Sequence, residues 1–287
     1  MRFLRSGFGG RRIRKVAEYL SPSLTDFIRD MRSEMKYVPQ GWYQIPGWND
    51  QGIADAQERH WPTLVRNVQG PGPLGVSHLP WRTTREDRAD HNILMSYGYV
   101  LARAARTKDR LTILDWGGGV GHYYLYSKAL LPEVELEYEC YDLPSLCRAG
   151  RKLQPDIRFH DDDKDLLGKP YDLVISSSSL HYFENWREQV RRLAACTGGF
   201  LYVARLQAVT AAPSFVAVHR PDRAGYSEFL SWCINRQEFL GCAEEHGLEL
   251  MREFVFTERW NIRGAPEKAE CRGFLLRRSL PKATIDG

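Results

Sequence analysis

The sequence has no apolar run long enough to cross a membrane, and no apolar leader of the kind that directs secretion. Its six cysteines include no pair with the Cys-x-x-Cys spacing of a zinc site or a redox centre. The net charge is only +4, so the overall charge does not require nucleic acid as a partner. These absences favour a reduced, cytoplasmic protein with no metal centre, no membrane contact and no nucleic-acid partner.

Two common nucleotide-binding patterns are missing as well. A dinucleotide site has the spacing Gly-x-Gly-x-x-Gly. Counted from Gly117, the third glycine would fall on His122, and counted from Gly118, the second would fall on Val120. A phosphate loop that ends in Gly-Lys-Ser or Gly-Lys-Thr is also absent. The sequence therefore argues against NAD and against a phosphate-loop nucleotide.

A short apolar run at residues 111–116 is nevertheless followed at once by a glycine-rich turn and then by residues 122–131, which contain neither glycine nor proline. This order predicts a buried strand, a tight turn and a helix. Such a turn lets the backbone lie against a ligand, and the start of the helix offers free N–H groups. The acidic and glycine residues of the turn are Asp115, Gly117, Gly118, Gly119 and Gly121.

The spacing Asp115-x-Gly117-x-Gly119-x-Gly121 resembles the first motif of the class I methyltransferases, which use S-adenosylmethionine (SAM). A second acid supports the resemblance. Asp142 follows a strand-like segment at residues 135–141 and lies 21 residues past Gly121, about where a ribose hydroxyl pair is held in related nucleotide sites. We therefore assign Asp115, the three motif glycines, Asp142 and the adjoining Leu143 to the SAM site.

Strand-like and helix-like segments then alternate to residue 204, which predicts a parallel sheet with ligands at the carboxyl ends of its strands. Two late strand-like segments, at 251–258 and 271–278, suit an antiparallel edge. We expect an α/β, Rossmann-like class I methyltransferase sheet that is mostly parallel. Residues 85–287 would form this domain, and residues 1–84 a helical and loop extension.

The resemblance extends to a bacterial family of methyltransferases often grouped with polysaccharide and secondary-metabolite genes. It rests on DWGGGVG, DLVISSSSLHYFENW, Arg205, SWCINRQEFL and GFLLRR, and covers roughly residues 85–280. It implies that Asp161 or Asp162 accepts from the adenine amino group and that Ser177 contacts the methionine part of SAM. A metal site at the triplet Asp161–Asp163 is the less favoured alternative.

His181 is the candidate catalytic residue. It lies nine residues after Asp172, where plant-type small-molecule O-methyltransferases have a general base. Their His-Asp-Trp context is absent, because the sequence here is HYFENW. A structural role for His181 therefore remains open.

The region before the first motif is rich in aromatic residues: Trp42, Tyr43, Trp48, Trp61 and Trp81. It could form a lid or wall over a pocket, a small separate core, or both. Residues 1–15 carry six basic residues and no acid, and we favour a solvated terminus over a basic arm or a targeting segment.

The function we predict is SAM-dependent methyl transfer to a small molecule, through an oxygen of a hydroxyl or carboxylate group on a metabolite or sugar. The alternatives are a nucleic-acid or protein methyltransferase and a non-catalytic SAM-binding scaffold. The sequence lacks the Asp/Asn-Pro-Pro-Tyr/Phe motif of amino-directed DNA methyltransferases. It also lacks a Pro-Cys pair, which would suggest a cytosine C5 methyltransferase. Both absences argue against a nucleic-acid base as the acceptor. It is compatible with a homodimer.

Overall fold

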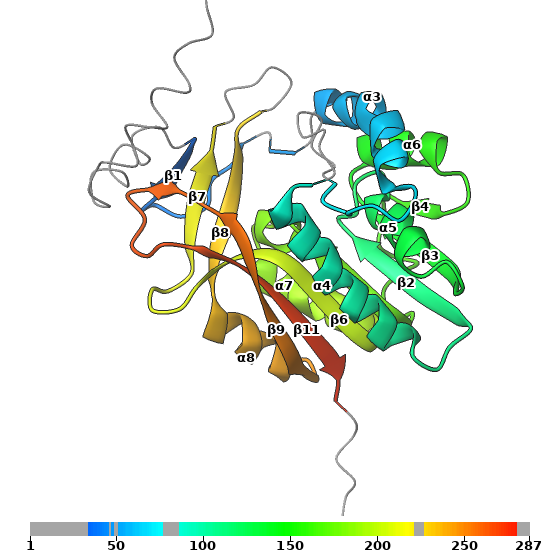
Figure 1. Ribbon diagram of the computed structural model, residues 1–287. Coiled ribbons are helices and arrows are strands. Elements are labelled where there is room, and N and C mark those ends of the chain that lie inside the picture. Colours follow the sequence, from blue (N-terminus) through cyan, green and yellow to red (C-terminus); the bar gives the residue numbers. More distant parts are fainter. Residues whose placement is uncertain (1–33, 46, 49–50, 77–85, 221–226, 280–287) are drawn as a thin grey trace, which may run out of the picture.

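The computed structural model describes residues 34–45, 47–48, 51–76, 86–220 and 227–279 (Figure 1). In chain order its elements are β1 Met35–Val38, α3 Gln51–Val68, α4 Arg88–Ala105, β2 Arg110–Trp116, α5 His122–Leu130, β3 Glu135–Tyr141, α6 Pro144–Leu153, β4 Arg158–His160, β5 Tyr171–Ser177, the 3₁₀ helix η1 Leu180–Tyr182, α7 Trp186–Cys196, β6 Thr197–Val209, β7 Phe215–His219, β8 Phe229–Asn235, α8 Arg236–Glu245, β9 Leu248–Arg259, β10 Ile262–Arg263 and β11 Glu270–Arg278.

The centre of the sheet is parallel and runs β4-β3-β2-β5-β6. The chain moves outward from β2 to β4, then returns to the other side of β2 with β5 and β6. The strand order therefore reverses between β2 and β5, and open α/β sheets bind ligands at the carboxyl ends of strands at such a point.

Two apolar cores cover the two faces of this sheet. Ile113 of β2 belongs to the core under α3, α4, α5 and α6, whereas its neighbour Leu114 belongs to the core under α7 and α8. The alternation follows from the pleat, which points successive side chains to opposite faces. Figure 1 shows α4 crossing one face of the sheet. Continuous apolar strands such as β2 are what a sheet covered on both faces requires.

The far side of the sheet is antiparallel, as the sequence predicts. β11 lies between β6 and β9 and is antiparallel to both. With the parallel centre, this arrangement confirms the Rossmann-like, mostly parallel fold with an antiparallel edge strand.

The chain adds a second group of strands that the sequence pattern did not predict. The last residues of β6 turn away from β5 and pair with β8, and the strands β8, β7 and β1 continue the sheet in antiparallel fashion. β1 also pairs with β10. Residues from before the first motif therefore form part of the sheet. The predicted basic terminus at residues 1–15 lies outside the described residues.

No helix in the described ranges is both long and apolar enough to cross a membrane.

Candidate active site

The glycine turn begins where β2 ends. Gly117 and Gly119 have φ angles of 76° and 64°, in the left-handed region that residues with a side chain rarely adopt. A Cβ at Gly117 would lie 2.3 Å from the Cβ of Ser179, so the turn has no room for one. Gly121 also has a positive φ, and it caps α5. The glycines are thus required by the path of the backbone.

Asp142 joins this turn to the end of β3. Its Oδ2 accepts from the backbone N–H of Gly119 at 2.7 Å, and its Oδ1 accepts from the N–H of Leu143 at 2.6 Å. Burial raises the pKa of Asp142 to about 6, although these two hydrogen bonds act to lower it. The carboxylate is held at the rim of the turn and can lose its proton near neutral pH.

Asp115 is the second carboxyl group of the turn. It is buried, and Tyr138 Oη donates to its Oδ2 at 2.8 Å. Burial raises its pKa to about 7, with a further contribution from Asp142. A cation that enters beside Asp115 would favour the ionised form.

A cavity of about 500 Å³ opens above the carboxyl ends of β2, β3 and β5. This volume is in the usual range for small-molecule sites. The parallel strands and the turns after them contribute these lining residues: Asp115, Gly117, Gly118, Gly119, Asp142, Leu143, Ser177 and Arg205. Ser177 Oγ is hydrogen-bonded to Tyr123 Oη at 2.7 Å, which fixes both side chains at the wall.

The other wall of the cavity comes from outside the parallel centre. Trp42, Tyr43 and Trp48 line it from the segment after β1, together with Phe229 of β8. The rings of Trp48 and Phe229 lie 4.6 Å apart between centroids. The predicted lid segment thus contributes to the cavity, while Trp61 is buried in α3 and contacts His122. Trp81 lies outside the described residues.

Residues 90–253, more than half of the chain, match the model of a methyltransferase-domain family. The chain belongs to this family. With the fold described above, this membership confirms the prediction of a class I, SAM-dependent methyltransferase. A comparison with curated protein sequences finds no match.

Solved methyltransferases have a similar fold at low sequence identity. The 1,6-didemethyltoxoflavin-N1-methyltransferase of Burkholderia thailandensis, with 1,6-didemethyltoxoflavin and S-adenosylhomocysteine (SAH) bound, is 12% identical with a TM-score of 0.50; the match covers 86% of this chain and 95% of that one. The magnesium protoporphyrin IX methyltransferase of Synechocystis PCC 6803, with SAH bound, is 17% identical with a TM-score of 0.46; the match covers 79% of this chain and 98% of that one.

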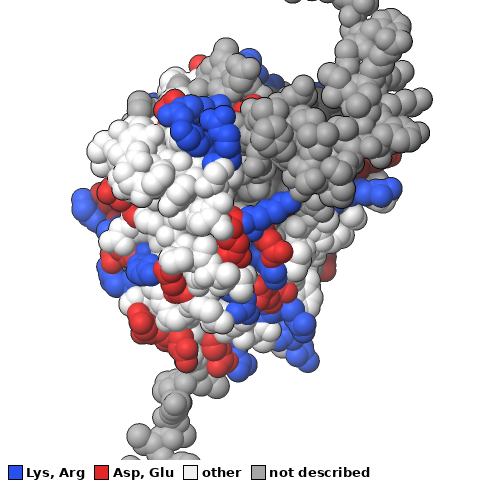
Figure 2. Space-filling view, turned by 90° about the vertical axis from the view of Figure 1, so that its left-hand side faces the viewer, with Lys and Arg blue, Asp and Glu red and all other residues white. Residues whose placement is uncertain are grey.

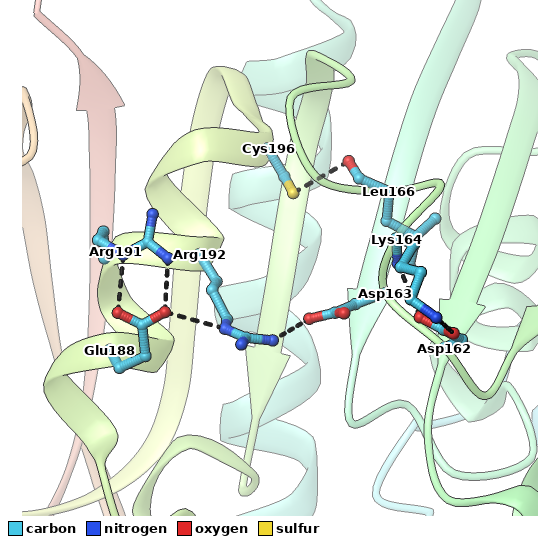
Figure 3. Close-up of polar contacts among 8 residues, drawn as sticks. All are labelled: Asp162, Asp163, Lys164, Leu166, Glu188, Arg191, Arg192 and Cys196. Atoms are coloured by element: carbon cyan, nitrogen blue, oxygen red, sulfur yellow. Dashed lines mark hydrogen bonds and ion pairs between the residues drawn. The ribbon is translucent and has the colours of Figure 1, made fainter.

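Asp161 and Asp162 of the methyltransferase do not line the cavity. Asp162 Oδ2 accepts from Lys164 Nζ at 2.8 Å, and the neighbouring Asp163 is paired with Arg192 (Figure 3). The Oδ2 atom of Asp161 lies 3.8 Å from Nη2 of Arg151. These pairs give the acidic triplet a structural use, and contact with adenine stays a prediction. No group of three or more potential metal ligands occurs among the described residues.

His181 is fully buried in η1 and is not among the cavity-lining residues. Neither ring nitrogen has a hydrogen-bond partner in the described structure. Burial, and then the charge of Arg205, lowers its pKa to about 3. The arrangement gives no support to the predicted base role, because a base must reach the proton that it removes.

Sequence reasoning missed two polar residues of the site. Gln57 lies in α3, an 18-residue helix that the pattern did not predict, and its Oε1 is buried without a partner beside the glycine turn. Arg205 entered only as part of the family resemblance. It lines the cavity with a φ of 54°, and the only other residue besides glycine with positive φ in the described ranges is Ser178, also in the lining. Strained backbone of this kind gathers at functional sites.

Proposed function

We propose that this protein transfers a methyl group from SAM to an oxygen of a small-molecule acceptor. The observation that carries the proposal is that one and the same cavity is lined by the glycine turn and Asp142 and by the aromatic wall at Trp48 and Phe229. A cofactor bound along the turn would lie in the same cavity as an acceptor against the wall. The narrower bacterial family remains a resemblance.

The residues present fit SAM. Asp142 would accept hydrogen bonds from the ribose hydroxyls, since a carboxylate can accept from both. Asp115 would balance the positive charge of the cofactor, and Ser177 would contact its methionine part. The unpartnered Oε1 of Gln57 gives a polar group of the cofactor an acceptor on the side of α3. When bound, SAM supplies an electrophilic methyl group and takes back the electron pair of the broken carbon–sulfur bond.

The protein's own contribution is mainly to position the acceptor and to exclude water. Holding two reactants in a near-attack geometry is a large part of the catalytic effect in such displacements. Trp42 and Trp48 form part of the cavity wall beyond the strand ends. Oxygen is the proposed acceptor because the Arg205 guanidinium in the wall can hold and orient an anionic oxygen group such as a carboxylate. A base at His181 is not part of this proposal.

A macromolecular acceptor fits less well. Aromatic side chains line much of the cavity, and Arg205 is the only lysine or arginine among its described lining residues. On the face drawn in Figure 2, the described lysines and arginines lie among aspartates and glutamates rather than in one broad basic area. Nucleic-acid binding rests on such areas.

The test is to incubate the protein with methyl-tritiated SAM and an extract of the cells from which its gene comes, split into a small-molecule fraction and a macromolecular fraction. We expect label in the small-molecule fraction, and none with the Asp142→Ala protein. Label in protein or nucleic acid would establish the alternative acceptor. Binding of SAM with no transfer to any fraction would favour a scaffold.

A further inference from the structure

The charge of the cavity is unevenly distributed. Four of its described lining residues are acids: Asp90, Asp115, Asp142 and Glu184. Only one lining residue in the described ranges, Arg205, carries a permanent positive charge; His122 is neutral because burial lowers its pKa to about 3. The acids Asp115 and Asp142 belong to the end where a cationic cofactor binds. Arg205 therefore needs a different explanation.

Arg205 lies on the far side of β5 from the glycine turn. β5 separates β6 from β2, and the register places Ala204 of β6 opposite Ser177. Arg205 is thus one strand farther from the glycine turn than the serine assigned to the cofactor. Three aromatic residues line the same cavity and contact one another: the ring centroid of Trp48 lies 5.0 Å from that of Tyr182 and 4.6 Å from that of Phe229.

The guanidinium of Arg205 has one edge occupied and one edge available. Its Nε and Nη2 donate to Glu258 at 3.0 and 2.9 Å, and the described structure gives it no other hydrogen bond. Glu258, on β9, is not a lining residue whereas Arg205 is, and Nη1 takes no part in the pair with Glu258. A planar guanidinium can hold a carboxylate on each of two edges.

Folding alone does not require a charge pair at this place. Arg205 is only 8% exposed, and a buried ion pair is often no more stabilising than apolar side chains of the same volume. The pair is also held in a left-handed backbone conformation that costs free energy. An oriented guanidinium with N–H groups left over, beside aromatic side chains, is suited to bind an anionic group that is attached to a flat apolar ring.

We propose that the acceptor is a small, flat carboxylic acid whose carboxylate is held by the free edge of Arg205, with its apolar body against Trp48, Tyr182 and Phe229. The buried Nε1 of Trp48, which has no partner in the described structure, offers one further donor in this wall. Glu258 orients the guanidinium through its two hydrogen bonds. This inference rests on the proposed methyl transfer and names the class of its substrate.

The test uses the full chain saturated with SAH, titrated with benzoate, benzamide and benzylamine, three probes of similar size that differ in charge. We expect benzoate to bind on the order of 10-fold more tightly than benzamide, the effect of a charge-assisted hydrogen bond, and benzylamine to bind least. Equal affinities, a preference for benzylamine, or no binding of any probe would overturn the proposal. Failure of SAH itself to bind would instead count against the proposed function.

The matched variant is Arg205→Gln with Glu258→Gln, because removing one partner alone would leave a buried charge and could unfold the protein. The double variant should bind SAH as the parent does and lose the preference for benzoate. A double variant that retains this preference contradicts the inference. One that folds but no longer binds SAH would assign Arg205 to the cofactor and would overturn it as well.

Discussion

Single residues decide how the site responds to acid. Burial raises the pKa of Asp142 to about 6 and that of Asp115 to about 7 in the ligand-free protein. If the cofactor binds to the ionised carboxylates, protons compete with it, and affinity must fall as the pH falls through these values. For Asp142 alone, the loss between pH 7.5 and pH 5.5 should be about 4-fold. Titration of SAH at the two pH values measures it, and Asp142→Asn should show a smaller dependence.

Asp142 also allows a direct test of its hydrogen bonds. Replacing it with Ala should weaken the binding of SAH by about 1–3 kcal/mol, the usual loss for a charged hydrogen bond. Asp162→Ala is the matched control, because Asp162 is turned toward Lys164 outside the cavity. Unchanged affinity in the Asp142 variant would remove this residue from the cofactor site, and weakened affinity in the control would support the predicted adenine contact.

His181 should matter for stability rather than for proton transfer. Its pKa is lowered to about 3 in the folded state, so the unfolded chain binds a proton first as the pH falls below about 6.5. Stability from this residue is therefore present above pH 6.5 and is lost below it, by about 1.4 kcal/mol at pH 5.5. Urea unfolding of His181→Leu at pH 7.5 and 5.5 should show a correspondingly smaller drop. An equal drop in both proteins would contradict this.

At the level of residues, the sequence could predict the turn and the aromatic segment with Trp42 and Trp48, but not the place of Arg205 and Gln57 in the walls. The glycines, Asp115 and Asp142 have a characteristic spacing at the ends of predicted strands, so the local pattern was enough to predict them. Arg205 and Gln57 reach the cavity only because β6 bends and because α3 lies over the turn. Neither fact is visible in local spacing, since both depend on contacts between distant segments.

Among the elements, α3 is a helix that the sequence pattern did not predict. It packs Ile53 and Leu64 into the core above α5 and α6, and it carries Gln57 to the glycine turn. Gln57→Ala should weaken the binding of SAH by roughly 3- to 10-fold, the effect of one neutral hydrogen bond, without changing the melting temperature of the protein. Glu58→Ala, one residue along the same helix and outside the lining, is the control. Equal effects of the two changes would mean that α3 acts only through its packing.

The segment after β1 should act on the acceptor rather than on the cofactor. Trp48 contacts Tyr182 and Phe229 in the wall away from Asp142. Trp48→Ala should leave the affinity for SAH within about 3-fold and lower turnover by 10-fold or more, since misplaced reactants lose much of the advantage of proximity. Weaker binding of SAH with unchanged turnover would place Trp48 in the cofactor site instead.

Elements of the parallel centre were predictable because each has a clear local signal. The segment 144–153, with proline at its first position, is helix α6, and 135–141 is strand β3. The added strands β1, β7 and β8 gave no such signal. They are stabilised by pairing with one another across long sequence distances, and the pairing partner of a short strand cannot be read from its own residues.

For the molecule as a whole, the family and the fold establish a methyltransferase, and the volume of the cavity, about 500 Å³, supports the proposal of a small acceptor. The domain division at residue 84 remains a proposal. β1 and α3, from before that point, pack into the sheet and its core, so a protein cut at residue 84 would expose buried side chains.

The most direct measurement is isothermal titration of the whole protein with SAH, and separately with NAD. The glycine spacing, Asp142 and the cavity predict saturable binding of one SAH per chain and no binding of NAD. The same titration with Asp142→Ala should show weaker SAH binding. No heat with SAH up to its solubility limit, or saturable binding of NAD, would contradict the account.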